Sequence, residues 1–520
     1  MAAKPHRFVS VCPQTVETSF MIERHVVFYI GSKVVAAVLN LASVALFTRL
    51  AGAAGYGEYL IAFAWAYIVY GWSVQWLPLS FFANFHHEDN ERQVATLWQM
   101  MAAMLALVWL AVALASLGGW IGWELGVKVT VLVVALAAYD GATLIGRAKL
   151  NAGRVSLSFV LRGLLVLAFG MVALIAFKSG LALALAVALA HLVAIAPLMP
   201  VLRPGLAAAS SPATARQFGL YGWPLLASFG ASSLGQNIDR LVLGRQRGNE
   251  QVGPYGAAGD LIRQSLVFIS EAIAIAYIPQ AKAAAAKGDR TAARAFMVQA
   301  FRAYCAVTLF GAVILLSFAA ELISLILGPQ FGRAATDLIP WLALGAALAI
   351  FRSYYLGQII YFTGSSRLEL WASIATVIAA TVLAVLLVPG WGAAGAAIAM
   401  ASGQGAACAV FLAAALGSPG GRTVLPLPWR DFLSIGCWAA GGYAVHLAAG
   451  HFLTDMALSD LVGAAGICLT LWMAVRIHNI MNFNDIISDF TNAMGRVGFS
   501  GDAGAGPVLP AEPARRNDDS

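Results

Sequence analysis

The feature that most constrains this chain is a lysine in the middle of a long apolar run. The run extends from Val26 to Phe47 and contains Lys33. A run of this length predicts a membrane-spanning helix, because about 20 apolar residues cross the hydrocarbon core. An ionised side chain near the centre of such a helix is costly unless it faces protein, water or ligand. Lys33 therefore predicts a helix bundle with a polar interior.

Charged residues interrupt other apolar segments as well. They are Asp140, Arg162, Asp239, Arg263, Glu271 and Arg352. Hydrophobic residues make up 60% of the chain and charged residues 11%, whereas soluble domains carry about 25% charged residues. This composition excludes a soluble enzyme and a disordered chain. It favours a bundle of membrane spans around a charged, wet interior, which is typical of a transporter and not of an enzyme.

Apolar segments of helical length number about fourteen, from residues 26–48 to residues 456–475. We therefore predict an all-α polytopic membrane protein. The segments divide the chain into an N-terminal extension (1–20), a six-helix bundle (21–210), a second six-helix bundle (211–416), two additional helices (417–480) and a cytoplasmic, partly disordered tail (481–520). Met21 is an alternative start to Met1.

The distribution of basic residues predicts how the chain is oriented. If the N-terminus is cytoplasmic, roughly three-quarters of the lysines and arginines outside the spans fall on the cytoplasmic side. This bias predicts cytoplasmic N- and C-termini and an even number of spans. The formal net charge of +7 thus reflects membrane sidedness, and we predict no nucleic-acid partner. The cluster Arg240–Arg247 is the exception, because it lies on the less favoured side.

Two connections in the sequence resemble each other. Arg49-Leu-Ala-Gly-Ala-Ala-Gly-Tyr-Gly-Glu-Tyr follows the first span, and Val252-Gly-Pro-Tyr-Gly-Ala-Ala-Gly-Asp-Leu follows the seventh. Each places a Gly/Tyr/Gly turn before the next span. Six spans separate the copies, so both have the same orientation. The pattern predicts two parallel halves, as in several secondary transporters.

At these residues the chain resembles the flippases of polysaccharide biosynthesis, which carry O-antigen and exopolysaccharide repeat units within the multidrug/oligosaccharidyl-lipid/polysaccharide exporter superfamily. The resemblance covers most of residues 22–475. It rests on Gly31-Ser-Lys with Thr48-Arg-Leu-Ala-Gly-Ala-Ala-Gly-Tyr-Gly-Glu-Tyr, Tyr221-Gly-Trp-Pro, Asn237-Ile-Asp-Arg-Leu-Val-Leu-Gly, Val252-Gly-Pro-Tyr-Gly, Leu327-Gly-Pro-Gln-Phe and Gly390-Trp-Gly-Ala-Ala-Gly-Ala-Ala. It implies two six-helix bundles around a central cleft, often with two extra helices. It also implies a multi-pass protein of the bacterial inner membrane that works in lipopolysaccharide or exopolysaccharide synthesis.

The substrate that the resemblance implies is a polyprenyl-diphosphate-linked oligosaccharide. A diphosphate crossing a membrane needs buried cations, because an unpaired charge is prohibitively costly in hydrocarbon. Lys33, Arg263 and Arg352 are the candidate cleft cations, and an arginine can hold phosphate oxygens bidentately. Alternatively, each cation is a structural clamp on a carboxylate. For Arg263 we favour the clamp, with Asp260 or Glu271 as its partner.

Aromatic and amide side chains on two spans are candidates for sugar contacts, because aromatic faces with polar tips suit carbohydrate rings. These residues are Trp72, Gln75, Trp76, Tyr355 and Gln358. Packing or anchoring at the membrane interface is the alternative for each of them.

Two carboxylates are candidates for ion or proton coupling. Burial raises the pKa of a carboxyl group and a nearby cation lowers it, so alternating access could switch the protonation of Asp140 or Asp239. The sequence has no P-loop for a nucleotide. Its five cysteines are scattered without a CxxC pair, which is typical of packing residues. We therefore predict no catalytic residue, no cofactor and no metal.

Other functions remain open. A drug/cation antiporter or a peptidoglycan-precursor flippase of the same superfamily fits the span pattern. A membrane polymerase or ligase fits less well, because the predicted outer connectors are short. The expected partners are the lipid-linked oligosaccharide, membrane lipid, and a polysaccharide polymerase and glycosyltransferases.

Overall fold

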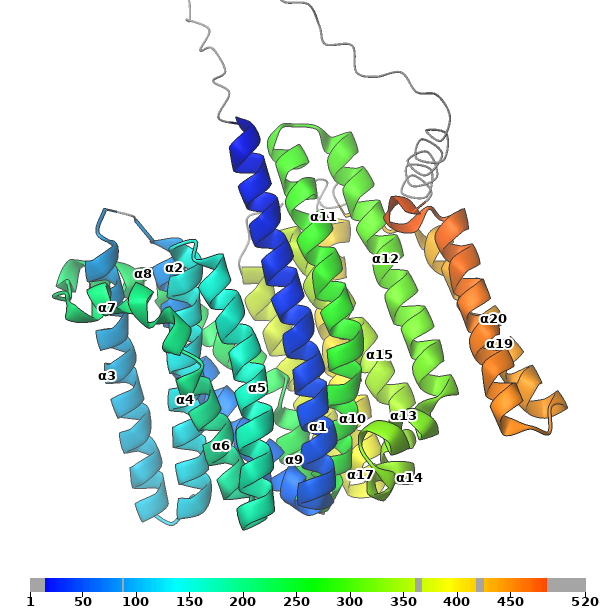
Figure 1. The fold of residues 1–520 in the computed structure, drawn as a ribbon, viewed down its shortest axis with the longest axis horizontal. Helices are drawn as coiled ribbons and strands as arrows, with labels where there is room; N and C mark the ends of the chain where they lie inside the picture. The colour runs from blue at the N-terminus through cyan, green and yellow to red at the C-terminus, as the bar shows by residue number, and fades with distance from the viewer. Residues whose placement is uncertain (1–14, 87, 361–366, 418–424, 484–520) are drawn as a thin grey trace, which may run out of the picture.

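The chain folds into a bundle of helices that run up and down between two ends of the molecule (Figure 1). The computed structural model describes residues 15–86, 88–360, 367–417 and 425–483. Every regular element in these ranges is a helix. Helices suit a membrane because each satisfies its own backbone hydrogen bonds without water. The predicted all-α, polytopic class is confirmed.

The N-terminal half, which we define as residues 15–207, contains seven of the described α-helices. They are α1 (Thr15–Ser73), α2 (Trp76–Ala83), α3 (Asn90–Leu117), α4 (Trp123–Ala148), α5 (Ala152–Phe177), α6 (Gly180–Val193) and α7 (Met199–Ala207). α1 holds two spans, because the chain reverses at Gly52, where φ is 68°. Glycine adopts this left-handed conformation without steric strain.

The C-terminal half, which we define as residues 212–417, has a similar sequence of spans. Its helices are α8 (Pro212–Gly235), α9 (Ile238–Arg247), α10 (Asn249–Ile262), α11 (Phe268–Ala286), α12 (Arg290–Ser317), α13 (Ala319–Ile326), α14 (Gly332–Thr336), α15 (Ile339–Ile350) and α17 (Arg367–Gly417). Two π-helical turns, η2 (Arg263–Val267) and η4 (Phe351–Tyr355), interrupt it, and the short helix η5 (Leu356–Gln358) follows η4. α17 is again two spans, divided at Gly392 with φ 53°.

Two further helices complete the described part of the bundle. α19 (Trp429–Phe452) and α20 (Met456–Ile477) pack against each other and against α12. α1 begins and α20 ends at the same end of the molecule (Figure 1), which indicates an even number of crossings.

Eleven helices in the described ranges are long and apolar enough to cross a membrane. Two of them, α1 and α17, each contain two of the predicted spans. The segment α8–α9 is outside the eleven but forms the predicted seventh span. Together these helices account for the spans predicted from the sequence.

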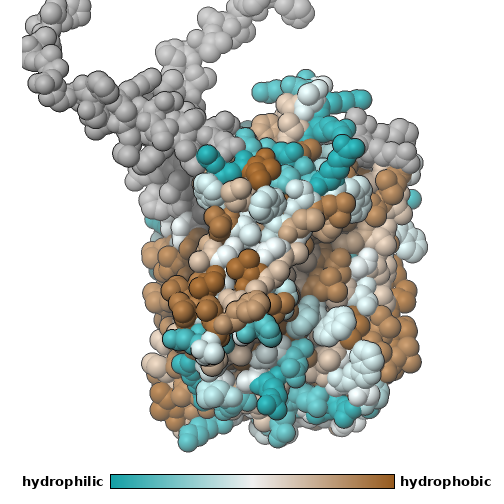
Figure 2. Space-filling model, turned by 90° about the vertical axis from the view of Figure 1, so that its right-hand side faces the viewer, coloured by the Kyte–Doolittle hydropathy of each residue, from teal (hydrophilic) through white to brown (hydrophobic). Residues whose placement is uncertain are grey.

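The surface of the bundle is suited to lipid. Figure 2 shows hydrophobic residues across the middle of one face and hydrophilic residues at both ends. Large apolar side chains on α19 and α20 are exposed, including Leu433, Leu447, Leu461 and Leu469. Exposed apolar area of this extent would be unfavourable in water. The two C-terminal helices therefore present a lipid-facing surface.

The two copies of the predicted repeat lie against each other. The chain turns at Gly52 and Gly248, which both have positive φ, and the Gly/Tyr/Gly residues lie in the helices that follow. A Cβ on Gly57 would come within 2.0 Å of the Asn249 oxygen, and one on Gly253 within 2.1 Å of the Ala53 oxygen. Small residues allow such close helix contacts in membranes. The prediction of a turn at Gly/Tyr/Gly is thus wrong, because these glycines serve packing between α1 and α10.

Candidate functional site

Lys33 joins the two halves. It lies on α1 and donates a hydrogen bond to the carboxylate of Glu271 on α11. Both side chains are about one-third exposed, at 33% and 35%. Around them lies a small apolar cavity of about 160 Å³, with Phe268 and Ile275 in its wall. The pair offsets the cost of a charge in a membrane span, which is the clamp interpretation of Lys33.

Asp140 is exposed although it lies within the membrane-spanning helix α4. Its Oδ2 accepts a hydrogen bond of 2.8 Å from the hydroxyl of Tyr70 on α1. The guanidinium of Arg162 on α5 lies 5.2 Å from the ring centroid of Tyr139, the residue before Asp140. Nε of Arg162 is buried and has no hydrogen-bond partner among the described residues. A carboxylate and an incompletely bonded arginine thus occur together in the N-terminal half.

Two arginines share one carboxylate in the C-terminal half. Asp260 Oδ1 lies 3.1 Å from Nη2 of Arg240 and 3.0 Å from Nη2 of Arg263. The hydroxyl of Tyr56, from the other half, is 3.3 Å from Asp260 Oδ2. The Arg263 side chain is nevertheless 61% exposed. The preferred clamp between Arg263 and Asp260 is present, and it leaves part of the guanidinium accessible.

Asp239 directly precedes Arg240, which is one of the two arginines bound to Asp260. It is buried and accepts a hydrogen bond from the Tyr255 hydroxyl through Oδ2, while its Oδ1 has no hydrogen-bond partner in the part of the chain that the structure describes. A cavity of about 140 Å³ is lined by Asp239, Arg240 and Arg263. Asp239 is therefore placed inside the C-terminal half, next to positive charge.

Arg352 is buried in the same half and makes several polar contacts. Its guanidinium nitrogens lie 3.2 Å from Glu369 Oε1, 3.3 Å from Gln404 Oε1 and 3.4 Å from Ser373 Oγ. Fixed by three partners, Arg352 has a defined orientation at the wall of a larger cavity of about 530 Å³.

This larger cavity, which we call the polar cavity, is rich in hydrogen-bonding groups. Its polar lining consists of Ser228, Ser232, Gln236, Arg352, Ser353, Gln358, Arg367, Glu369 and Gln404. Gln236 and Gln404 also line the smaller cavity at Arg263. Arg263 and Arg352 therefore lie beside adjoining cavities, whereas Lys33 lies at a separate one.

The two arginines also share an unusual backbone setting. Arg263 begins the π-helical turn η2, and Arg352 lies in the π-helical turn η4. Such turns insert a residue into a helix and are frequent at functional sites. Nothing in the hydrophobic period of the sequence marks them.

Three of the candidate sugar-contact residues pack against other parts of the protein. Trp72 lies against Gly230 and Trp76 against Gly222, because a Cβ on either glycine would come within 2.2 Å of the indole. Trp76 is buried, and so is Tyr355, whose hydroxyl donates to the Pro426 carbonyl.

Tyr355 is fully buried at 0% exposure, so its ring is not accessible to a sugar in this arrangement of the helices. Trp76 is buried as well, at 7% exposure. Trp72 stays 43% exposed, Gln75 is half-buried beside α2, and Gln358 lines the polar cavity.

The N-terminal half also contains a group of ion pairs that the sequence analysis did not predict. Lys128 is buried in α4 at 3% exposure. It contacts Glu58, from the second span, and lies 2.9 Å from Glu124. The spacing of four residues between Glu124 and Lys128 was the available signal, since such pairs meet on a helix.

Residues 85–336 match the model of a protein family described as "Polysaccharide biosynthesis protein". The predicted family resemblance is confirmed. A sequence comparison with curated proteins gave no match.

Solved structures of the exporter superfamily share the fold. "Lipid II flippase MurJ, inward closed conformation" has a TM-score of 0.69 at 13% identity, covering 89% of this chain and 100% of that one. An inward-facing multidrug resistance MATE family transporter has a TM-score of 0.56 at 16% identity, covering 72% and 93%. The eukaryotic MATE transporter AtDTX14 has a TM-score of 0.56 at 14% identity, covering 77% and 97%. At such identities these likenesses show the fold alone.

Proposed function

We propose that this polysaccharide-biosynthesis protein is a flippase for polyprenyl-diphosphate-linked oligosaccharides. It would work by alternating access of two bundles, residues 21–210 and 211–416, in a bacterial cytoplasmic membrane with both termini cytoplasmic. A polysaccharide polymerase and glycosyltransferases would act on the same lipid carrier. Translocation would involve no covalent step, so the protein would be a transporter and not an enzyme.

The polar cavity is the observation that carries the proposal. Its charged lining comprises Arg352, Arg367 and Glu369, which leaves one positive charge in excess. The remaining polar groups are hydroxyls and amides, which form hydrogen bonds with sugar hydroxyls. The volume of about 530 Å³ lies within the range of ligand sites, about 300–1,000 Å³. Positive charge and neutral hydrogen-bonding groups together suit an anionic glycolipid headgroup.

Arg263 and Lys33 would act before or after the polar cavity on the substrate path. Arg263 is exposed beside the adjoining cavity. Lys33 would become available to phosphate only if Glu271 released it. Trp72, Gln75 and Gln358 are the proposed sugar contacts that are accessible in this structure. Trp76 and Tyr355 would contact a sugar only in another arrangement of the helices, because both are buried here.

Asp140 and Asp239 remain the proposed coupling carboxylates. The position of Asp140 supports this role, because its side chain is exposed within a span and accepts a hydrogen bond from Tyr70. An exposed carboxylate can exchange a proton or bind a cation as access alternates. The same observation would suit a drug/cation antiporter, which is the second candidate function.

A transport assay in liposomes separates these functions. The purified protein is reconstituted, and translocation of a fluorescent polyprenyl-diphosphate sugar is compared with uptake of a cationic dye. We expect the glycolipid to move and the dye to stay. Arg352→Gln should reduce glycolipid translocation about tenfold, as expected for loss of a charged hydrogen bond, and Arg352→Lys should retain more. Movement of the dye alone would contradict the proposal.

Comparing sugar headgroups distinguishes the flippases. A peptidoglycan precursor carries the same diphosphate but a different sugar. Preference for the peptidoglycan precursor over oligosaccharide repeat units would favour the peptidoglycan-precursor flippase instead.

A further inference from the structure

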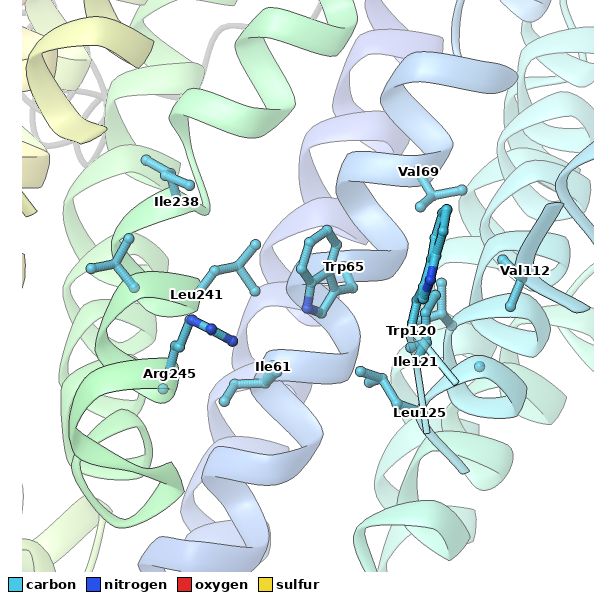
Figure 3. Close-up of a pocket in the computed structure, with 14 residues that line it drawn as sticks. Ile61, Trp65, Val69, Val112, Trp120, Ile121, Leu125, Ile238, Leu241 and Arg245 are labelled. Carbon is cyan, nitrogen blue, oxygen red and sulfur yellow. The ribbon is translucent and has the colours of Figure 1, made fainter. Parts of the chain in front are cut away.

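An apolar groove of about 780 Å³ lies between the two halves. Its floor is the second span of α1, and its walls are α9 on one side and the α3–α4 turn with the start of α4 on the other (Figure 3). Trp65, which lies on the floor, is 41% exposed, so the groove is open to its surroundings. Most of its lining is aliphatic or aromatic, including Ile61, Val69 and Leu241.

Arg245 is the one charged residue in the described lining of this groove. It is exposed and makes no ion pair within the described ranges. Figure 3 shows its side chain at the wall formed by α9, next to Leu241 and Ile61. An apolar groove with a single cation at its wall is complementary to a molecule with one anionic group and a hydrocarbon chain.

The other arginines of the Arg240–Arg247 cluster have partners that explain their position. Arg240 pairs with Asp260. Arg247 donates to the carbonyls of Val388 and Pro389 at the start of the turn within α17. The positive-inside rule disfavours all three arginines on this side, and among the residues that the structure describes no partner accounts for Arg245.

The depth of the groove fits one leaflet of a membrane. Arg245 lies in the last turn of α9, near the end of the bundle opposite to the start of α1 (Figure 1). Trp120 is 88% exposed at the same end, as is typical of tryptophans at headgroup level. From Ile61 to Val69 the helix rises about 12 Å, comparable to the half-thickness of the hydrocarbon core, about 15 Å.

We propose that this groove binds an anionic phospholipid, with its phosphate at Arg245 and one acyl chain along Ile61, Trp65 and Val69. The groove contains one cation and few hydrogen-bonding groups, which suits a small monoanionic headgroup better than an oligosaccharide diphosphate. Because α9 and α1 belong to different halves, the lipid contacts both. A ligand that binds only one arrangement of the halves stabilises that arrangement.

The test uses the full-length purified protein and lipids of equal chain length. Binding of palmitoyl-oleoyl phosphatidylglycerol and phosphatidylcholine is compared by native mass spectrometry. We expect phosphatidylglycerol to be retained preferentially, and Arg245→Ala to weaken its binding about tenfold, in line with loss of a charged contact. Arg245→Lys should keep most of the binding. A phosphatidylglycerol with a photoreactive acyl chain should cross-link to residues 61–69.

Arg333→Ala is the matched control, because Arg333 is also exposed at this end but does not line the groove. Leu241→Trp fills the groove and should reduce cross-linking while leaving Arg245 in place. Equal binding of the two lipids, equal loss in the Arg245 and Arg333 variants, or displacement of phosphatidylglycerol by a polyprenyl phosphate would overturn the proposal. This experiment measures lipid binding and not translocation, so its result does not depend on whether the proposed flippase function is correct.

Discussion

At Lys33, a charge in a membrane helix is offset by a carboxylate from the other half of the molecule. The pair therefore stabilises one particular arrangement of the halves and would have to break when they part. Arg263 and Arg352 differ from Lys33, because their carboxylate partners lie in their own half. Of the three predicted cations, only Lys33 thus depends on the relative position of the halves.

Exchanging the charges of this pair tests its role. Lys33→Glu and Glu271→Lys each place like charges together, and each should lower stability by about 1 kcal/mol for these half-exposed groups. The double variant should recover most of that loss. Thermal unfolding in detergent measures stability, and liposome transport measures function. A double variant no better than the single ones would show that the two side chains do not interact.

Asp140 allows a second prediction at this scale. Asp140→Asn keeps the size of the side chain and a partner for Tyr70 but removes the charge. If Asp140 couples transport to protons, the variant should lose the dependence of transport on a proton gradient, with a rate reduced about tenfold, or about 1.4 kcal/mol. Tyr70→Phe, which keeps the charge, should retain that dependence. Normal gradient dependence in both Asp140→Asn and Asp239→Asn would remove the coupling hypothesis.

At the scale of elements, the contact between α1 and α10 depends on glycines. Gly57 and Gly253 bring the two backbones so close that neither position has room for a Cβ. Membrane helices pack through such small residues because close backbone approach adds van der Waals contact. The sequence repeat is thus explained by the contact between its own two copies.

Gly253→Ala should separate α1 from α10. The new methyl group would lie 2.1 Å from the Ala53 backbone oxygen, and overpacking of this kind costs about 1–3 kcal/mol. We expect a lower unfolding temperature in detergent. Gly441→Ala on α19 is the control, because nothing lies within 4 Å of its added Cβ. Equal stability of the two variants would contradict the packing role.

At the scale of the whole molecule, the even number of crossings places the described ends of the chain on one side. Together with the distribution of basic residues, this predicts that Thr454, between α19 and α20, faces outward and Ser210, between α7 and α8, faces the cytoplasm. In a background without exposed cysteines, Thr454→Cys should react with a membrane-impermeant maleimide in intact cells. Ser210→Cys should react only after permeabilisation. The reverse pattern would invert the proposed orientation.

The sequence predicted the fold better than the site. Span positions follow from hydropathy, and the Arg263–Asp260 pair follows from a spacing of three residues on a helix. The Lys33–Glu271 pair joins residues 238 apart, and local patterns carry no information at that distance. Tyr355 and Gln358 looked equivalent in the sequence, yet only Gln358 lines a cavity. The π-helical turn at Tyr355 changes which side chains face inward, and hydrophobic periodicity does not register it.

The glycine contact between α1 and α10 has a mechanical implication. Dispersion attraction fades when surfaces separate by an ångström or so, and bare backbone has no long side chains to keep touching as a gap widens. The contact between α1 and α10 would therefore be strong while the backbones touch and would be lost over a short separation. The proposed alternation of access would then be an abrupt step between two arrangements of the halves, not a gradual bending.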